Sequence, residues 1–177
     1  MNYKTVCISG LVLWAFVMAS AQTKTTMTGT CGKPEVQQSV AAGDQQGHAF
    51  RVAQGTCTIT GSVNGAVAKQ GNFAEEVEAT PTTMKNRGVY VVTFDSGDKI
   101  YYKYQGSATM KDGTYQAGTN KYEIAGGTGK MQGITGSGAC KLTGKGDDTL
   151  EYSCTGDYSM GHATGSRSKG RTTPVNR

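Results

Sequence analysis

The sequence predicts an all-β protein whose strands form a small closed barrel. Between Gln22 and Met160, short runs rich in Thr, Val, Tyr and Ile are separated by Gly, Asp and Asn, and no stretch of eleven residues has a convincing helical period. Only three prolines interrupt the chain, so most runs can pair as strands. The third observation is the stretch "NKYEIAGGTGKMQGITGSGACKLTG" at 120–144, in which glycines fall on one face of a predicted strand.

Residues 1–21 have the features of an export signal. Lys4 precedes an apolar run over 6–18, and the tripeptide ASA at 19–21 is a small-residue cleavage pattern. The run is too short, and wrongly flanked, for a spanning helix. We therefore expect cleavage between Ala21 and Gln22 and an extracytoplasmic protein, either periplasmic or secreted. An uncleaved membrane anchor is the alternative.

Four cysteines remain after this cleavage, an even number in a compartment that permits disulfides. Cys31 and Cys57 lie symmetrically about the turn-like sequence "AAGDQQ", and Cys140 and Cys154 about "GKGDD". Four cysteines allow three connectivities. Antiparallel folding at these centres would set each pair face to face, and on this ground we predict Cys31–Cys57 and Cys140–Cys154. We expect no metal site, because the sequence has no C-x-x-C spacing and its two histidines are isolated.

The positive charge is concentrated at the C-terminus. The chain has 18 Lys and Arg against 13 Asp and Glu, and the excess lies in the Gly- and Ser-rich tail "GHATGSRSKGRTTPVNR", which we expect to be disordered. Its few cations, with no aromatic residue among them, favour a solvated end over a nucleic-acid or membrane contact. We thus predict a signal peptide (1–21), an N-terminal extension with one or more edge strands (22–47), a single barrel domain (48–160) and a basic tail (161–177).

The clearest hairpin is "RGVYVVTFDSGDKIYYKYQG" at 87–106. With Ser96-Gly97 as a two-residue loop, one face of the hairpin carries Val89, Val91, Thr93, Ile100, Tyr102 and Tyr104. The other face includes two lysines and is expected to meet solvent; it carries Tyr90, Val92, Phe94, Lys99, Tyr101 and Lys103. Tyr102 and Tyr104 would then place their phenol groups inside the barrel.

The same alternation assigns other side chains to the interior. Phe50 shares a face with Val52 in "HAFRVAQGTCTIT", and Tyr122 shares a face with Ile124 in "NKYEIAG". In "NFAEEVEA" the apolar face takes Glu75 with it. A buried carboxylate must be paired or have a raised pKa. Alternatively, the strand begins later or is bulged, and Glu75 remains in water at the rim.

The glycine-rich stretch does not have the spacing of a phosphate-binding loop. After Lys130 comes Met131 where a Walker loop needs a hydroxyl residue, and the third glycine comes one residue too late for a dinucleotide fingerprint. Instead a tight "GGTG" turn leads into a strand whose inward face includes Gly136 and Gly138 beside Ile134. Glycines on an inward face permit sharp coiling or the close approach of an aromatic ring, as a small barrel requires.

The segment "YEIAGGTGKMQGITGSGACKLTG" resembles the I-x-G-G-T-G-[KR]-aromatic-x-G-x-x-G-x-G pattern of allene oxide cyclase and dirigent proteins, and especially small secreted bacterial proteins of unassigned function. "HAFRVAQGTCTITG", the 87–106 hairpin and "LEYSCTGDY" also resemble the bacterial group, so the resemblance covers about residues 48–158. Met131 departs from it, since an aromatic residue is usual there. The resemblance implies a single eight-stranded antiparallel barrel, calycin-like in shape, and it transfers no catalytic residue.

The sequence lacks the usual motifs of hydrolytic enzymes. Neither a G-x-S-x-G elbow nor H-E-x-x-H occurs, and His48 is more typical of a surface residue than of a general base. We expect the interior to bind a small, mainly apolar ligand without catalysis and without a cofactor. The residues predicted to contact this ligand are Tyr102, Tyr104, Tyr122, Glu75 and Phe50.

Two alternatives remain open. The interior could be filled, leaving a disulfide-stabilised envelope or secreted module that acts through its surface. The protein could also be a cyclase-like isomerase in which Glu75 acts as a charge or proton acceptor. A cavity above ~300 Å³, the low end of ligand pockets, would favour binding or isomerisation.

Overall fold

The computed structural model describes residues 22–146 and 148–161, which form antiparallel strands and one 3₁₀ turn. The described strands are β1 (Thr23–Cys31), β2 (Val36–Ala41), β3 (Ala49–Val63), β4 (Ala66–Ala79), β5 (Thr83–Phe94), β6 (Lys99–Lys111), β7 (Thr114–Gly127), β8 (Ile134–Gly146) and β9 (Thr149–Met160), with the turn η1 (Gly129–Met131) after β7. The predicted signal peptide and residues 162–177 of the predicted tail lie outside the described residues. In the part of the chain that is described, no helix has the length and apolar character needed to cross a membrane.

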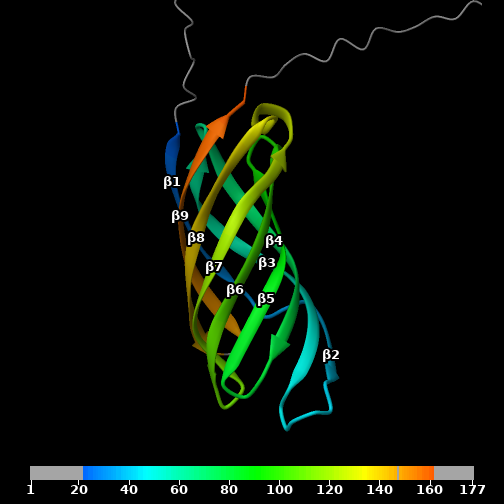
Figure 1. Ribbon diagram of the computed structural model, residues 1–177. Coiled ribbons are helices and arrows are strands. Elements are labelled where there is room, and N and C mark those ends of the chain that lie inside the picture. Colours follow the sequence, from blue (N-terminus) through cyan, green and yellow to red (C-terminus); the bar gives the residue numbers. More distant parts are fainter. Residues whose placement is uncertain (1–21, 147, 162–177) are drawn as a thin grey trace, which may run out of the picture.

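Eight strands close into an antiparallel barrel, as predicted (Figure 1). From β3 to β9 each strand is hydrogen-bonded to the next, β9 pairs with β1, and β1 returns to β3. The closing seam runs from the pair Met27–Gly61 to the pair Cys31–Cys57. The sequence had placed β1 in an extension before residue 48. It belongs to the barrel, because it fills the gap between β9 and β3.

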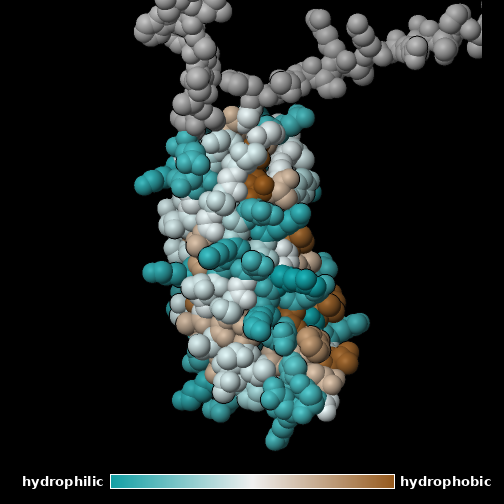
Figure 2. Space-filling model, in the orientation of Figure 1, coloured by the Kyte–Doolittle hydropathy of each residue, from teal (hydrophilic) through white to brown (hydrophobic). Residues whose placement is uncertain are grey.

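Strand β2 is the additional strand and extends from one corner of the barrel (Figure 1). It pairs with β3 alone, on the edge of β3 that β1 occupies farther along. Val36 and Val40 of β2 are 54% and 71% exposed, and they lie beside the exposed Phe50 and Val52 of β3. Apolar colour therefore appears on the surface at this corner (Figure 2).

The β5–β6 hairpin differs by one residue from its predicted register. Phe94 N–H donates to the carbonyl of Asp98, and the N–H of Gly97 donates to the carbonyl of Phe94, so the loop has three residues rather than two. Gly97 occupies the left-handed region (φ +84°) that such a loop requires. Because side chains alternate, this shift reverses the faces of β5. The predicted inward face of β5 was therefore wrong: Val92 and Phe94 are buried, and Val89 is exposed.

The predicted face of β6 is confirmed. Ile100 and Tyr102 are buried, while Lys99, Tyr101 and Lys103 are exposed. Tyr122 and Ile124 of β7 also face inward, where both pack against the core. These predictions succeeded because they used the alternation of side chains within β6 and within β7. The error in loop length affects only the faces assigned to β5.

Apolar side chains fill the end of the barrel at which η1 lies. The largest fully buried side chains are those of Phe94, Ile100, Met131, Ile134, Val63 and Val92. Sequence alternation had placed Met131 on a strand, on the face opposite Ile134. It lies instead in η1 and is fully buried, since β8 begins only at Ile134.

Inward glycines accommodate the rings of inward tyrosines. A Cβ atom added to Gly138 of β8, or to Gly156 of β9, would overlap the hydroxyl of Tyr122. Gly71 stands in the same relation to Tyr90, and Gly29 to Tyr152. The expectation that inward glycines permit an aromatic ring to approach is therefore confirmed. Each of these glycines makes room on the narrow interior surface for part of a phenol.

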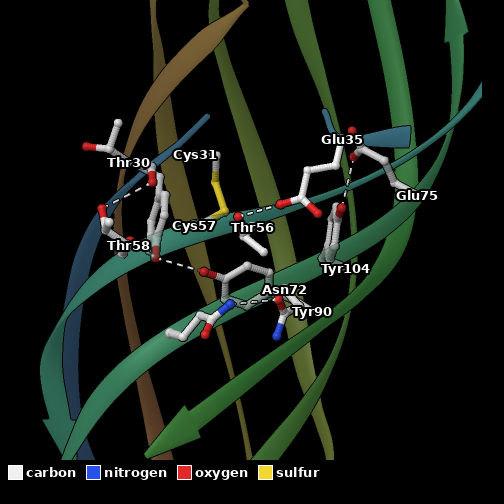
Figure 3. The surroundings of a disulfide bond; sticks show 12 residues. Thr30, Cys31, Glu35, Thr56, Cys57, Thr58, Asn72, Glu75, Tyr90 and Tyr104 are labelled. Carbon is white, nitrogen blue, oxygen red and sulfur yellow. Dashed lines mark hydrogen bonds between the residues drawn. A yellow bond between two sulfur atoms is a disulfide. The ribbon is translucent and has the colours of Figure 1, made fainter. Parts of the chain in front are cut away.

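The two disulfides connect the cysteine pairs predicted from the sequence. Cys140–Cys154 links directly paired residues of β8 and β9. Cys31–Cys57 links β1 to β3 at the end of the closing seam (Figure 3). Beside it, the Thr56 hydroxyl donates to Oε1 of Glu35 (2.7 Å), which fastens the chain after β1 to β3. Both disulfides thus hold strands in register.

Candidate functional site

The barrel contains a cavity of about 210 Å³ toward the end opposite η1. All eight barrel strands contribute to its wall, which includes six tyrosines. Gly32, Gly113 and Asp148 also border it and are exposed. The cavity therefore reaches the surface between the β1–β2 connection, the β6–β7 turn and the β8–β9 turn.

Glu75 is at the centre of a polar cluster in the cavity wall. Its Oε2 accepts a hydrogen bond from the Tyr104 hydroxyl (2.9 Å; Figure 3) and another from Nδ2 of Asn86 (2.8 Å). Burial raises the pKa of the Glu75 carboxyl, and these two hydrogen bonds oppose that rise only in part. β4 extends past Glu75 on both sides, so the predicted inward direction of this side chain is confirmed and the rim alternative is excluded.

The tyrosines form a second group of contacts across the barrel. The hydroxyls of Tyr90 and Tyr152 are 2.9 Å apart and hydrogen-bonded. The rings of Tyr102 and Tyr122 meet edge to face, with centroids 5.4 Å apart. Burial raises the pKa of all four phenols, and it raises the pKa of Tyr115 to about 12, with the charge of Glu75 as a smaller cause. These groups are therefore neutral at physiological pH and can both donate and accept hydrogen bonds.

The structure brings four of the five predicted contact residues together. Tyr102, Tyr104, Tyr122 and Glu75 all border the cavity. Phe50 does not: its side chain faces outward, and it packs against His48 with ring centroids 5.2 Å apart. Its predicted inward position was wrong. Cys57 is on the inward face of β3, and because side chains alternate along a strand, residue 50, seven positions earlier, lies on the outward face.

Sequence reasoning missed several residues that border the cavity. Tyr90 was assigned to the outer face because of the one-residue error at the β5–β6 loop. Counting back from Cys57 would have placed Arg51 and Ala53 inside, and both border the cavity. Asn86 was missed through the same error on β5, and Tyr115 because a register shift between Thr109 and Met110 changes the alternation along β7. Tyr152 lies on β9, whose inward face the sequence pattern left unassigned.

His48 lies outside the cavity wall. Its Nδ1 is hydrogen-bonded to Oδ1 of Asp44 (2.7 Å), and its Nε2 lies 3.4 Å from Oε1 of Glu78. The His48 hydrogen bond lowers the pKa of Asp44. These contacts hold the β2–β3 turn against β4. Within the described residues, no group of His, Cys, Asp and Glu side chains has the arrangement of a metal site.

The buried carboxyl predicts an unusual dependence of stability on pH. Between the ordinary glutamate pKa of 4.5 and the raised value, the folded protein binds more protons than the unfolded chain. The stabilisation from protonated Glu75 is fully present below pH 4.5 and is lost as the pH rises through the raised pKa. Glu75→Gln keeps an acceptor for Tyr104 and Asn86. We expect Glu75→Gln to be more stable than the wild type at pH 8. The difference in unfolding free energy should shrink as the pH falls, by up to ~1.4 kcal/mol per pH unit, and vanish near pH 4.

Urea unfolding across this pH range measures the effect. The matched control is Glu76→Gln, because Glu76 is the next residue, points outward and pairs with Arg87 on the surface. The interpretation of Glu75 is wrong if the two variants show the same pH profile.

The comparisons with known proteins relate to the fold. No protein-family model matches the sequence, and no match was found among the curated proteins. Among solved structures, the chain is similar to the pterocarpan synthase dirigent protein GePTS1, with a TM-score of 0.45 and 11% sequence identity. The match covers 86% of this chain and 98% of that one. At this identity the likeness is one of fold alone.

Proposed function

We propose that the protein binds a small, mainly apolar organic molecule inside the barrel and does not transform it. The observation that carries this proposal is a surface-connected cavity bounded by tyrosine rings and a few polar groups. Such a combination is typical of ligand sites, in which apolar walls provide affinity and isolated polar atoms fix orientation. Tyr104, Tyr122 and Glu75 are the proposed contacts.

The volume restricts the size of the ligand. About 210 Å³ does not reach ~300 Å³, which is the low end of drug-sized pockets and the volume above which binding or isomerisation was expected to be favoured. It is larger than the ~150 Å³ engineered apolar cavity that binds benzene. A single ring or a short acyl chain would therefore fit. A completely filled interior, the condition for a protein that acts through its surface alone, is disfavoured by this space.

The proposed location is extracytoplasmic, after removal of residues 1–21. Two disulfides that join paired strands are compatible with an oxidising compartment. Export would place the barrel where small extracellular molecules are available to it.

Titration with toluene, followed by amide NMR, tests the proposed binding site. We expect saturable shifts at residues of the cavity wall, such as Tyr104 and Tyr122, and a rise in melting temperature. Ala53→Leu adds a larger side chain to the wall and should abolish these shifts. The control Ala74→Leu places the same side chain on the exposed face of β4 and should leave them unchanged. Shifts confined to Phe50 and Val52 on the outer face would contradict the proposal.

A further inference from the structure

The Nε of Arg51, a partly buried residue, is a buried donor atom without an acceptor. Arg51 extends from the inward face of β3 and borders the cavity. Its Nε is inaccessible to solvent and has no hydrogen-bond partner, and no carboxylate of the described residues is ion-paired with it. Glu75, the acidic residue of the same cavity, is engaged by Tyr104 and Asn86 instead. A guanidinium N–H left unpaired in this way is costly.

Asn86 has an unpaired acceptor where Arg51 has an unpaired donor. Because its Nδ2 donates to Glu75, the orientation of the amide is defined, and its Oδ1 is left as a buried acceptor without a donor. Arg51 pairs with Val77 on one side of β4, and Asn86 pairs with Val77 on the other. The two residues therefore belong to one layer of the barrel, with their backbones roughly 10 Å apart across two strand spacings. One cavity thus contains both an unpaired cationic donor and an unpaired neutral acceptor.

Both unpaired atoms are closed to water, so a ligand would meet the outer N–H groups of the Arg51 guanidinium, which belongs to a partly buried residue that borders the cavity. We propose that the molecule bound in the barrel is a small carboxylic acid, whose carboxylate binds Arg51 while its apolar body lies against the tyrosine rings. This inference rests on the proposed function, and it adds the chemical class of the ligand.

A carboxylate suits the site better than a neutral oxygen. Its two oxygens match the planar donor edge of a guanidinium, and charge-assisted hydrogen bonds are about twice as strong as neutral ones. The site lies near the open end of the cavity, since Arg51 also borders the exposed β2–β3 turn. The charged end of the ligand could therefore stay close to water while the ring enters the interior.

Two nearly isosteric compounds test the ligand class: 4-methylbenzoate and 4-methylbenzyl alcohol, titrated at pH 7 and followed by amide NMR. We expect the wild type to bind the acid about 10- to 100-fold more tightly than the alcohol. In Arg51→Gln this preference should disappear, with alcohol binding unchanged. Arg51→Lys keeps the charge without the planar donor edge and should retain part of the preference.

Arg87→Gln is the matched control, because it removes the same side chain from β5 on the outward face, where Arg87 is exposed. It should leave the preference intact. Equal affinity for acid and alcohol in the wild type, or an equal loss in Arg87→Gln, overturns the assignment of Arg51 while binding in the barrel stands. Failure of toluene and of both compounds to bind rejects the proposed function itself. Melting curves of the variants identify any loss of fold.

Discussion

Removal of the Cys31–Cys57 disulfide is expected to cost about 3.5 kcal/mol of unfolding free energy, from the entropy of a 26-residue loop. Because this disulfide lies at the closing seam, its removal should weaken the seam more than the rest of the barrel. The β1–β3 seam closes the barrel with only five paired residues, whereas β1 pairs with β9 over nine. Without the covalent link, the seam should become the first part of the barrel to open.

The measurement combines urea unfolding with amide hydrogen exchange on Cys31→Ala/Cys57→Ala. Faster exchange is expected at the seam, for example at Gly29 and Ile59, and not at the β6–β7 pairs. The control is Cys140→Ala/Cys154→Ala, which opens a 14-residue loop inside one hairpin and should cost about 3 kcal/mol without selective exchange at the seam. Uniform exchange in both variants would show that the seam is not a weak point.

Gly138→Val is expected to destabilise the barrel by more than the ~1–3 kcal/mol typical of overpacking, and to prevent accumulation of folded protein at 37 °C. A Cβ at this position would overlap both the Tyr122 hydroxyl and the backbone carbonyl of Thr155. The ring borders the cavity and could shift into it, but the Thr155 carbonyl is part of the β8–β9 pairing and cannot move without disturbing it. The conflict therefore cannot be relieved by a side-chain rotation alone.

The neighbouring substitution Ala139→Val provides the control. Residue 139 is exposed on the outer face of β8, where a β-branched side chain suits a strand. We expect a change within ~0.5 kcal/mol. Equal stability of Gly138→Val and Ala139→Val in urea would contradict the proposed role of inward glycines as space for tyrosine rings.

Much of the barrel could be predicted from the sequence because two-residue alternation is a direct consequence of strand geometry. It located Tyr102, Tyr104, Tyr122 and Glu75 correctly, since each lies within a regular strand. It failed for β5, because "DSG" is compatible with a loop of two or three residues and the choice reverses every side chain beyond it. The closing role of β1 was also missed, since it depends on contacts with β3 and β9, which are distant in sequence.

The chemistry of the site was less predictable than its position. The cavity volume results from how rings and glycines on eight strands fit together, and no local pattern encodes it. The unpaired atoms of Arg51 and Asn86 likewise depend on which neighbours reach them across the barrel. Arg51 was additionally hidden by Phe50, whose apolar side chain suggested the wrong inward face for β3.

Native mass spectrometry of the protein purified from its own host tests most directly whether the barrel interior is a ligand site. We expect a non-covalent adduct of one small organic molecule per chain, which is released on denaturation and is replaced when toluene is added in excess. A spectrum that contains only the mass of the bare polypeptide, under conditions that preserve the folded charge states, would contradict ligand binding in the barrel.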